Sequence, residues 1–310
     1  MEFSYTPLGT ASATPSVYRY PSAHVLNIRG RLFLIDCGEA CQIRLRRMGV
    51  SFLKIDHIFI SHMHGDHVFG LFGLLSSMAM VGRTSLLNLY APAAMRRTLD
   101  FFLTEFGEGV KFEIAFHSLE AVTEPTVIAP LRNLDILAFP LRHRMPTYGF
   151  LFQEHEPEPN LHKELVQQYD LGIYEMACLK RGQDVVREDG TCLRSEDFTY
   201  KPWEPRSFAY CSDTAPFPNL PGWVKGVDLL YHESTFAEAL QENAATTLHS
   251  TARQAATCAL EAGVGRLLIG HFSARYPDLS VLLEEARSVF PNTDIAKELT
   301  TFEIPLKKHC

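Results

Sequence analysis

Four potential metal ligands fall within six residues, directly after a stretch that has the composition of a buried strand. The stretch KIDHIFI (54–60) is apolar and rich in β-branched residues, and SHMHGDH (61–67) follows it at once. The next segment, VFGLFGLLSSMAM (68–80), is apolar nearly all round and predicts a buried helix. A strand that leads through such a turn into a helix is typical of α/β proteins, which bind ligands at the carboxyl ends of their strands. The chain therefore predicts an α/β fold with a site at this turn.

The alternation of strands and helices continues on both sides of this turn. Residues 24–36 predict a hairpin around Arg29-Gly30, LLNLYAP (86–92) a strand, and AAMRRTLDFFLTEF (93–106) a helix. Further strands are expected at 208–214, 227–235, 266–272 and 299–306, and further helices at 250–263 and 278–290. Thr251 and Gln254 have the spacing of a capping box at the start of the first of these helices.

The composition is that of a globular protein. The chain has 310 residues, of which 46% are apolar and 21% charged, and no apolar run reaches the roughly 18 residues of a membrane helix. The start, MEFSYTPLGT, lacks the features of a signal peptide. The seven cysteines are scattered and odd in number, which predicts reduced thiols. We therefore expect a cytoplasmic protein without a membrane partner.

Residues 153–206 differ in character from the rest of the chain. They are polar, carry charges of both signs and contain four prolines, Pro157, Pro159, Pro202 and Pro205. We expect one domain over residues 1–310, with this stretch as an inserted arm that projects from its core. A short helix near 160–169 and a hairpin near 188–190 are expected within the arm.

The ligand cluster itself predicts a metal site. Imidazole and carboxylate groups bind zinc and similar divalent ions, and His62, His64, Asp66 and His67 supply four of them. An open catalytic zinc site usually has three protein ligands, so four groups in one loop favour two adjacent metals. An exposed histidine-rich loop is the alternative interpretation, against which the flanking strand and helix argue.

Three further polar residues follow apolar strands in the same way. His143 follows ILAFPLR, Asp213 follows FAYCS, and His271 follows LLIG. Each one alone could be an ordinary buried or loop residue. Together, at the strand ends of an alternating α/β chain, they predict the rest of a ligand set. A carboxylate can bridge two cations, and Asp213 is the natural candidate for this role.

The order of these motifs resembles that of the metallo-β-lactamase superfamily. HxHxDH, a later histidine, an aspartate and a last histidine occur in the superfamily's order. Within it the chain resembles the ribonuclease Z family, the tRNA 3′-processing endonucleases, in its short form. The segments that carry this resemblance are LGTASATP, SHMHGDHVFG, HRMPTYGF, YCSDT, HESTF, LHST and GHFSARY. The resemblance implies a four-layer αβ/βα sandwich with a dinuclear metal site between two sheets.

The resemblance also implies roles for individual residues. Two Zn²⁺ ions per subunit would be held by His62, His64 and His143, by Asp66, His67 and His271, and by Asp213, which both ions would share. Asp66 would accept a proton from the attacking water, His249 would be the general acid, and Glu233 would orient His249. His249 could instead merely precede a helix cap, and Glu233 could support His232.

The resemblance further implies RNA as the substrate and a homodimer as the assembly. The arm of one subunit would serve the active site of the other and bind precursor tRNA. Candidate substrate-binding residues are Arg19, Lys180, Arg181 and Arg275. Arg275 could equally form a surface salt bridge. The chain departs from the family where Val17 and Tyr20 replace a lysine and an asparagine, and where the tip of the arm, DLGIYEMACLKRGQDV, lacks the prolines of the family's Gly-Pro-rich turn.

Two other functions compete with a tRNA-processing phosphodiesterase. One is a metallo-β-lactamase-fold hydrolase of small phosphodiesters or esters, which has no need for an arm of this length. The other is a non-enzymatic RNA-binding protein with a degenerate site, which should lack some of the seven ligands, whereas all seven are present. The net charge of −7 argues mildly against RNA, although a local basic patch suffices for binding.

Overall fold

The computed structural model describes residues 1–14 and 16–308. The chain divides into two compact units. The first contains Met1–Gln153 and Ser207–Ile304, and the second contains Glu154–Arg206 with the C-terminal residues from Pro305 on. Among the described residues, no helix combines the length and the apolar character needed to cross a lipid bilayer. The six cysteines within this part of the chain are unpaired, as predicted, and Cys310 lies outside it.

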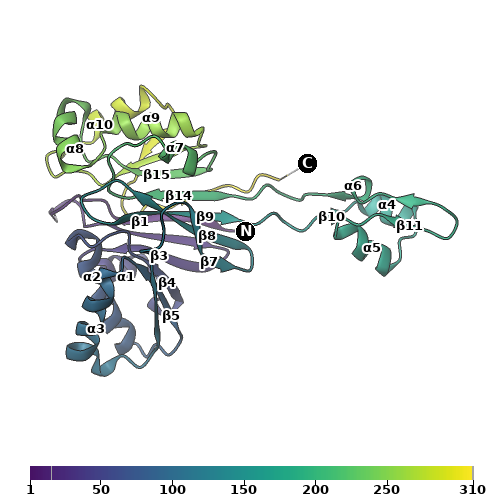
Figure 1. The fold of residues 1–310 in the computed structure, drawn as a ribbon, viewed down its shortest axis with the longest axis horizontal. Helices are drawn as coiled ribbons and strands as arrows, with labels where there is room; N and C mark the ends of the chain where they lie inside the picture. The colour runs from purple at the N-terminus through teal and green to yellow at the C-terminus, as the bar shows by residue number, and fades with distance from the viewer. Residues whose placement is uncertain (15, 309–310) are drawn as a thin grey trace. The chain divides into compact units, whose positions relative to one another are not determined.

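The first sheet of the first unit has seven strands in the order β18-β1-β2-β3-β4-β5-β6. These are β1 (Phe3–Gly9), β2 (Ala23–Ile28), β3 (Arg31–Cys37), β4 (Ile55–Phe59), β5 (Leu87–Ala91), β6 (Ile114–Ser118) and β18 (Phe302–Glu303). Strands β3 to β6 are parallel, so their carboxyl ends share one edge. The helices α1 (Cys41–Arg47), α2 (Gly65–Met80) and α3 (Ala94–Phe106) cover its outer face, with short 3₁₀ turns at Phe52–Lys54 and Gly107–Gly109 (Figure 1).

The second sheet also has seven strands, in the order β17-β16-β15-β14-β9-β8-β7. These are β7 (Thr126–Leu131), β8 (Leu134–Leu141), β9 (Thr147–Glu154), β14 (Ser207–Cys211), β15 (Leu229–Glu233), β16 (Leu267–Gly270) and β17 (Thr293–Ile295). Strands β14 to β17 are parallel. Its outer face carries α7 (Leu220–Trp223), α8 (Gln241–Thr247), α9 (Ala252–Ala262) and α10 (Ser280–Arg287), with a 3₁₀ turn at Glu238–Leu240 (Figure 1).

Aromatic side chains fill the space between the two sheets. Phe59 of the first sheet stacks on Tyr90 with ring centroids 4.7 Å apart and lies 5.3 Å from Phe150 of the second sheet. All three side chains are buried. Separate apolar clusters join each sheet to its own helices. Helix, sheet, sheet and helix thus form four layers, and the predicted four-layer sandwich is confirmed.

The structure differs from the prediction for the helix after the ligand cluster. The helix α2 begins at Gly65, three residues earlier than expected, so Asp66 and His67 lie in its first turn. Nor is the helix buried all round, because Phe69 is 64% and Met80 80% exposed. One face packs on the sheet through Leu71, Leu74 and Leu75, while the opposite apolar face remains uncovered.

The second unit has its own small core. Leu171, Leu179, Leu193 and Phe198 form a buried apolar cluster. The unit contains the helices α4 (Lys163–Gln168), α5 (Ile173–Lys180) and α6 (Ser195–Phe198). It also contains two short antiparallel strand pairs, β10 (Asn160–Leu161) with β13 (Thr199–Tyr200) and β11 (Val185–Val186) with β12 (Cys192–Leu193). The expected short helix and hairpin are present as α4 and β11–β12, while α5 was not predicted.

Candidate functional site

All seven predicted ligands lie together at the carboxyl ends of strands. Strand β4 leads to the first two, the first turn of α2 carries the next two, and β8, β14 and β16 each end just before one more. In chain order the seven are His62, His64, Asp66, His67, His143, Asp213 and His271. The parallel strands β14 and β16 end at the same edge of their sheet, which explains how residues far apart in the sequence meet.

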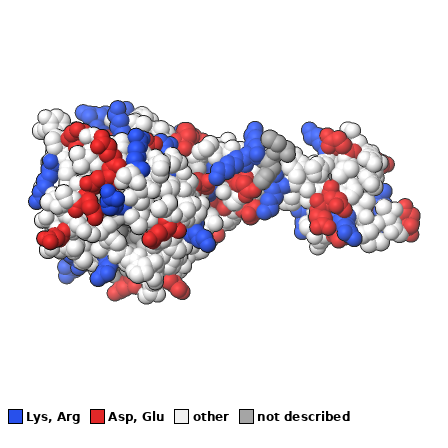
Figure 2. Space-filling view, turned by 90° about the horizontal axis from the view of Figure 1, so that it is seen from above, with Lys and Arg blue, Asp and Glu red and all other residues white. Residues whose placement is uncertain are grey.

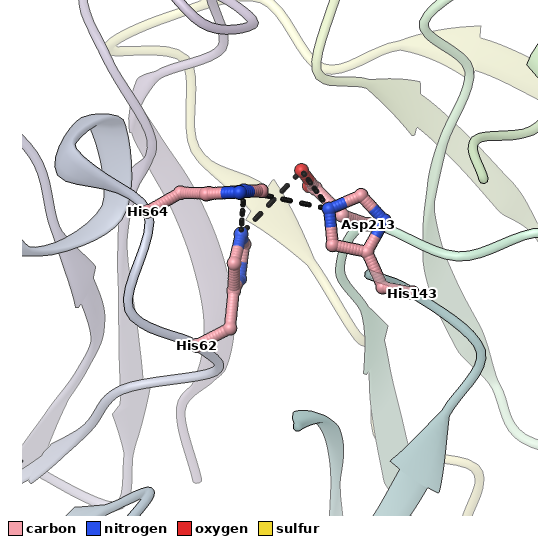
Figure 3. Close-up of side chains that lie close together, drawn as sticks. All are labelled: His62, His64, His143 and Asp213. Carbon is pink, nitrogen blue, oxygen red and sulfur yellow. Dashed lines mark hydrogen bonds and ion pairs between the residues drawn. The ribbon is translucent and has the colours of Figure 1, made fainter. Parts of the chain in front are cut away.

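The first group of ligands consists of His62, His64, His143 and Asp213. One ring nitrogen of each histidine and one oxygen of Asp213 all lie within 4.8 Å of one another, and the four side chains point toward a common centre (Figure 3). His62 Nε2 lies 2.9 Å from His64 Nδ1 and 3.6 Å from Asp213 Oδ2. His143 Nε2 lies 3.4 Å from His64 Nδ1. Four donor atoms at this spacing can surround one metal ion.

The second group consists of Asp66, His67 and His271. Asp66 Oδ2 lies 3.6 Å from Nε2 of both histidines, and the two Nε2 atoms are 3.3 Å apart. Asp213 joins this group through its other oxygen, because Oδ1 lies 3.5 Å from His67 Nε2 and 3.2 Å from His271 Nε2. The Asp213 carboxylate therefore stands between the two groups, with one oxygen toward each.

The residues of both groups fit a bound metal. Asp213 Oδ1 is buried and has no hydrogen-bond partner among the described residues, a costly arrangement that a cation relieves. Burial disfavours a charged His67, yet the surrounding carboxylates Asp36, Asp213 and Asp66 raise its pKa to about 10. The local field thus favours positive charge at this point. Together with the imidazole and carboxylate donors, these observations indicate a metal-binding site.

Asp36 is a functional residue that the sequence analysis missed. It is the last residue but one of β3, is fully buried, and its Oδ2 lies 2.7 Å from His67 Nδ1. The same oxygen accepts hydrogen bonds from Ser61 Oγ and Tyr210 Oη. A carboxylate on the far nitrogen of a ligating histidine fixes the ring and makes it more basic. Asp36 follows the apolar strand RLFLI, so the pattern that found the other ligands could have found it too.

Replacing Asp36 by asparagine should weaken metal binding without unfolding the protein. Asparagine keeps the shape but loses the charge that orients His67, and such outer partners are worth about 10- to 100-fold in metal affinity. Competition against a chelating dye measures the change, with Asp100→Asn, an exposed carboxylate on α3, as the control. Unchanged affinity in Asp36→Asn would show that His67 does not need this partner.

The backbone around the site is held in an unusual conformation. Among the described residues, eight other than glycine have positive φ, and four of them touch the site: Ala13, Asp36, Leu248 and His271. The Ala13 amide donates to Asp66 Oδ2 over 2.7 Å, and the Leu248 carbonyl oxygen lies 2.9 Å from His143 Nδ1. Such conformations cost on the order of 1–3 kcal/mol each and cluster at functional sites. The strained backbone positions therefore belong to one predicted ligand, His271, and to residues that hydrogen-bond to other predicted ligands.

Glu233 and His249 form a pair beside the second oxygen of Asp213. His249 Nδ1 lies 2.8 Å from Glu233 Oε1, and its Nε2 lies 3.9 Å from Asp213 Oδ2. Glu233 is fully buried and accepts hydrogen bonds from the amides of Thr214 and Ser250. Burial opposes both charges, but the pair's attraction lowers the pKa of Glu233 to about 2 and raises that of His249 to about 9. Their contact favours an ionised Glu233 and a protonated His249.

The alternative interpretations of this pair can be compared with the geometry. His232 Nδ1 lies 2.7 Å from the backbone oxygen of Glu233, while the carboxylate of Glu233 contacts His249. His249 does precede a helix cap, since Thr251 and Gln254 form the predicted capping box of α9. His249 therefore both precedes the cap of α9 and contacts the carboxylate of Glu233, so the first observation does not exclude the second.

A pocket of about 440 Å³ opens onto these side chains. It is lined by Ser12, Ala13, Pro21, Glu39, His64, Gly65, Asp66, Phe69, Asp213, His249 and His271. Members of both ligand groups and His249 therefore face one space. A phosphodiester in this pocket would meet the ligand cluster and a protonated imidazole together.

The predicted substrate-binding residues lie outside the lining of this pocket. Arg19 donates hydrogen bonds from Nη2 to the backbone oxygens of Ser273 and Tyr276, over 3.3 and 2.8 Å. Arg275 is exposed, with its guanidinium 5.8 Å from the ring centre of Phe236. Lys180 and Arg181 lie at the C-terminal end of α5, in the second unit.

Comparison with known proteins shows full-length relatives. The chain is 42% identical over 297 residues to ribonuclease Z of Bacteroides fragilis, which covers 96% of this chain and 97% of that protein. It is also 42% identical to ribonuclease Z of Phocaeicola vulgatus over 303 residues, 98% of each chain. Residues 3–160 match the family model described as Anti-Pycsar protein Apyc1.

Solved structures share the fold. The crystal structure of human tRNase Z, short form, matches with a TM-score of 0.71 at 24% identity, covering 97% of this chain and 99% of that chain. A metallo-β-lactamase fold protein of Bacillus subtilis, YhfI, matches with a TM-score of 0.70 at 18% identity, covering 98% and 100%. The chain therefore belongs to the ribonuclease Z family of metallo-β-lactamase-fold proteins and, through residues 3–160, to the family described as Anti-Pycsar protein Apyc1.

Proposed function

We propose that this protein removes the 3′ trailer from precursor tRNA by hydrolysing one phosphodiester bond. As a member of the ribonuclease Z family it is a phosphodiesterase and an endoribonuclease of tRNA 3′ processing. One structural observation carries the proposal: the pocket is lined by members of two metal-ligand groups and by His249, whose ring contacts the buried Glu233. Metal ions held by such ligands can activate a water molecule for attack on a phosphate, and the Glu233–His249 pair can protonate the oxygen that leaves.

The bound metal is proposed to be two Zn²⁺ ions per chain. One group, His62, His64 and His143, would hold the first ion, and the other, Asp66, His67 and His271, would hold the second. Asp213 would be shared, which the placement of its two oxygens supports. When bound, zinc ions supply Lewis-acid chemistry, since they lower the pKa of a water molecule toward about 7 and offset the charge of the phosphate.

The chain's own residues would move the two protons of the reaction. Asp66 is held by the Ala13 amide and would accept a proton from the water that attacks phosphorus. His249, kept protonated by Glu233, would give its proton to the 3′ oxygen as the bond between phosphorus and that oxygen breaks. The tRNA then ends in a 3′ hydroxyl, and the trailer begins with a 5′ phosphate.

The inserted stretch of the second unit, residues 154–206, is proposed to bind the body of the precursor tRNA. This stretch carries seven Lys and Arg against twelve Asp and Glu, which gives it a net charge of −5. Both signs of charge appear side by side on its visible surface (Figure 2). Four of its cations pair with carboxylates, namely Arg187, Arg194, Lys201 and Arg206. RNA binding would therefore depend on a few cations rather than on net charge.

Lys180 and Arg181 are the proposed contacts. Within the described residues neither is paired with a carboxylate, and both lie at the C-terminal end of α5. Tyr174, which is 76% exposed, lies in the first turn of the same helix, seven residues before Arg181. An exposed aromatic ring and cations on one helix suit the stacking and phosphate contacts of RNA. Arg19 and Arg275, in the first unit, are proposed to contact the substrate nearer to the pocket. Arg275 is the more available, since Arg19 is engaged by two carbonyl oxygens.

Deleting residues 160–200 tests the role of the second unit. We expect cleavage of precursor tRNA to fall steeply while hydrolysis of bis(p-nitrophenyl) phosphate is retained, because the ligands and His249 lie in the first unit. The milder variant Lys180→Ala/Arg181→Ala should reduce the salt dependence of tRNA binding by about two counter-ions, with Arg194→Ala as control.

Two outcomes would count against the proposal. Equal loss of both activities would show that the second unit does not select the tRNA. A wild-type protein that hydrolyses the small diester but leaves precursor tRNA intact would favour the small-phosphodiester hydrolase instead. Analysis of the ends should find a 3′ hydroxyl on the tRNA and a 5′ phosphate on the trailer.

We also propose that the protein acts as a homodimer in the cytoplasm. The dimer follows from the family resemblance, in which one subunit's inserted unit serves the other's active site. The location follows from the substrate, because precursor tRNA is processed there.

A further inference from the structure

A chain of hydrogen bonds crosses the buried space between the two sheets and ends at Asp36. Tyr5 Oη on β1 lies 2.8 Å from His24 Nδ1 on β2, and His24 Nε2 lies 3.0 Å from Ser22 Oγ. Ser22 Oγ lies 3.2 Å from Tyr210 Oη on β14, which lies 2.7 Å from Asp36 Oδ2. Each of these five residues is at most 1% exposed. Both sheets therefore contribute to one polar chain in the core.

Aromatic side chains surround this polar chain. The ring of His24 lies 4.8 Å from that of Tyr231, and the ring of Tyr5 lies 4.9 Å from that of Phe208, measured between centroids. Buried polar groups in such surroundings cost free energy unless each one is paired, and a half-paired network is worse than an apolar core. An apolar core would be enough for the fold, so these polar groups indicate a further role.

Asp36 fixes the direction of every hydrogen bond in the chain. A carboxylate can only accept, so the Tyr210 hydroxyl donates to Asp36, and the single hydrogen of Ser22 must then go to Tyr210. Ser22 therefore accepts from His24, whose burial lowers its pKa to about 3 and leaves one hydrogen on the ring. That hydrogen lies on Nε2, and Nδ1 accepts from the Tyr5 hydroxyl.

The opposite tautomer of His24 would break the chain. With the hydrogen on Nδ1, His24 Nε2 would take the hydrogen of Ser22, which would then have none for Tyr210. The Tyr210 hydroxyl could donate to Ser22 or to Asp36 but not to both. One buried contact between two oxygens would be left without a hydrogen, at 3.2 Å or 2.7 Å. Only the tautomer with the hydrogen on Nε2 satisfies all four contacts.

At its other end the chain reaches one ligand from each metal-ligand group. Asp36 Oδ2 lies 2.7 Å from His67 Nδ1 and 2.9 Å from Ser61 Oγ. Ser61 Oγ in turn lies 2.9 Å from His62 Nδ1. Since Ser61 gives its hydrogen to Asp36, its oxygen accepts from His62. Both histidine rings therefore donate from Nδ1, which leaves their Nε2 atoms to face the ligand cluster.

We propose that this chain, from Tyr5 to Tyr210, positions the metal site by holding Asp36 in the orientation that presents Nε2 of two ligating histidines to the metal. Tyr210 acts directly on Asp36, whereas His24 and Ser22 act through Tyr210. The inference rests on the proposed metal centre and adds positioning residues that contact neither metal nor substrate. Hydrogen bonds in a chain polarise one another, so the effect of a substitution should decrease from Tyr210 to Tyr5.

The tautomer of His24 tests the direction of the chain in the unaltered protein. Long-range proton–nitrogen NMR of the zinc-loaded protein, prepared with isotope-labelled histidine, shows which ring nitrogen carries the hydrogen. The signal that disappears in His24→Gln identifies the ring. We expect the hydrogen on Nε2. A hydrogen on Nδ1 would overturn the proposed direction and, with it, the positioning of Asp36.

Two tyrosines stacked on each other provide a matched pair of variants. Tyr210 and Tyr231 are both buried, and their ring centroids are 4.9 Å apart. The Tyr231 hydroxyl has no hydrogen-bond partner among the described residues, so Tyr231→Phe is the control. In competition against a chelating dye, Tyr210→Phe should bind zinc about 10-fold more weakly, at the lower end of what outer partners contribute, whereas Tyr231→Phe should match the wild type. Tyr5→Phe should lose less affinity than Tyr210→Phe.

The outcomes separate this inference from the proposed function. The visible spectrum of the cobalt-loaded protein should change in Tyr210→Phe and not in Tyr231→Phe, because only the former alters the geometry around the metal. Unchanged zinc affinity in Tyr210→Phe would overturn the inference. An equal loss in both tyrosine variants would also overturn it, since it would indicate core packing. In either case a wild-type protein that binds zinc and cuts precursor tRNA leaves the proposed function intact, whereas a wild-type protein that binds no zinc would overturn the metal centre itself.

Discussion

Replacing Asp213 by alanine should lower the rate of precursor tRNA cleavage by roughly 10³-fold or more. Its two oxygens face different ligand groups, with Oδ2 3.6 Å from His62 Nε2 and Oδ1 3.2 Å from His271 Nε2. One substitution therefore removes a donor from both of the proposed metal positions, and metal ions contribute several kcal/mol to the stabilisation of charge in the transition state. Single-turnover cleavage under excess enzyme measures the effect, with Asp278→Ala at the surface as the control.

The same substitution should destabilise the folded protein mainly when metal is present. Without metal, it removes a buried oxygen that has no hydrogen-bond partner among the described residues, but it also removes that oxygen's ion pairs with His67 and His271, so the two effects oppose each other. With metal present, the substitution also removes binding energy that only the folded state gains. Thermal unfolding of both proteins, with and without added zinc, compares the two cases. A variant that cleaves within about tenfold of wild type would contradict the shared-ligand role.

Replacing His249 by alanine should lower turnover of precursor tRNA by about 10²- to 10⁴-fold, the usual contribution of a general acid. Its Nδ1 contacts Glu233 over 2.8 Å, and Glu233 favours the protonated ring. The loss should be much smaller on bis(p-nitrophenyl) phosphate, because p-nitrophenolate leaves without receiving a proton. The turnover of precursor tRNA by Glu233→Gln should lie between that of the wild type and that of His249→Ala, since glutamine keeps the shape of the side chain but not its charge.

Metal content separates this role from that of a ligand. His249, Asp213 and His271 also lie close enough to share an ion. As a general acid, His249 can be removed while the metal content stays at the wild-type level. If the metal content falls, or if both substrates lose the same factor, His249 binds metal and the leaving oxygen takes its proton elsewhere.

One sequence pattern predicted most of what positions the site. Polar residues directly after apolar strands located His143, Asp213 and His271, because parallel strands end at a shared edge. The pattern missed Asp36 only because it was used to search for metal ligands and not for residues that hydrogen-bond to those ligands. Hydrogen bonds between residues far apart in the chain, such as the one from Tyr210 Oη to Asp36, cannot be inferred from spacing.

Other features depend on packing that a single sequence does not reveal. The strand β17 has three residues, and α5 has eight without a clear apolar face, so neither has a periodicity strong enough to predict it. The apolar character of α2 predicted a buried helix, which is right for one face only. It could not show that Phe69 and Met80 on the opposite face are exposed.

Metal content per chain, measured by elemental analysis on the samples used for cleavage assays, tests the central claim most directly. We predict two zinc ions in the wild-type protein, fewer than one in Asp213→Ala, and loss of precursor tRNA cleavage on chelation that is restored when zinc returns. A wild-type protein stripped of metal that still cuts precursor tRNA at its original rate would contradict the account.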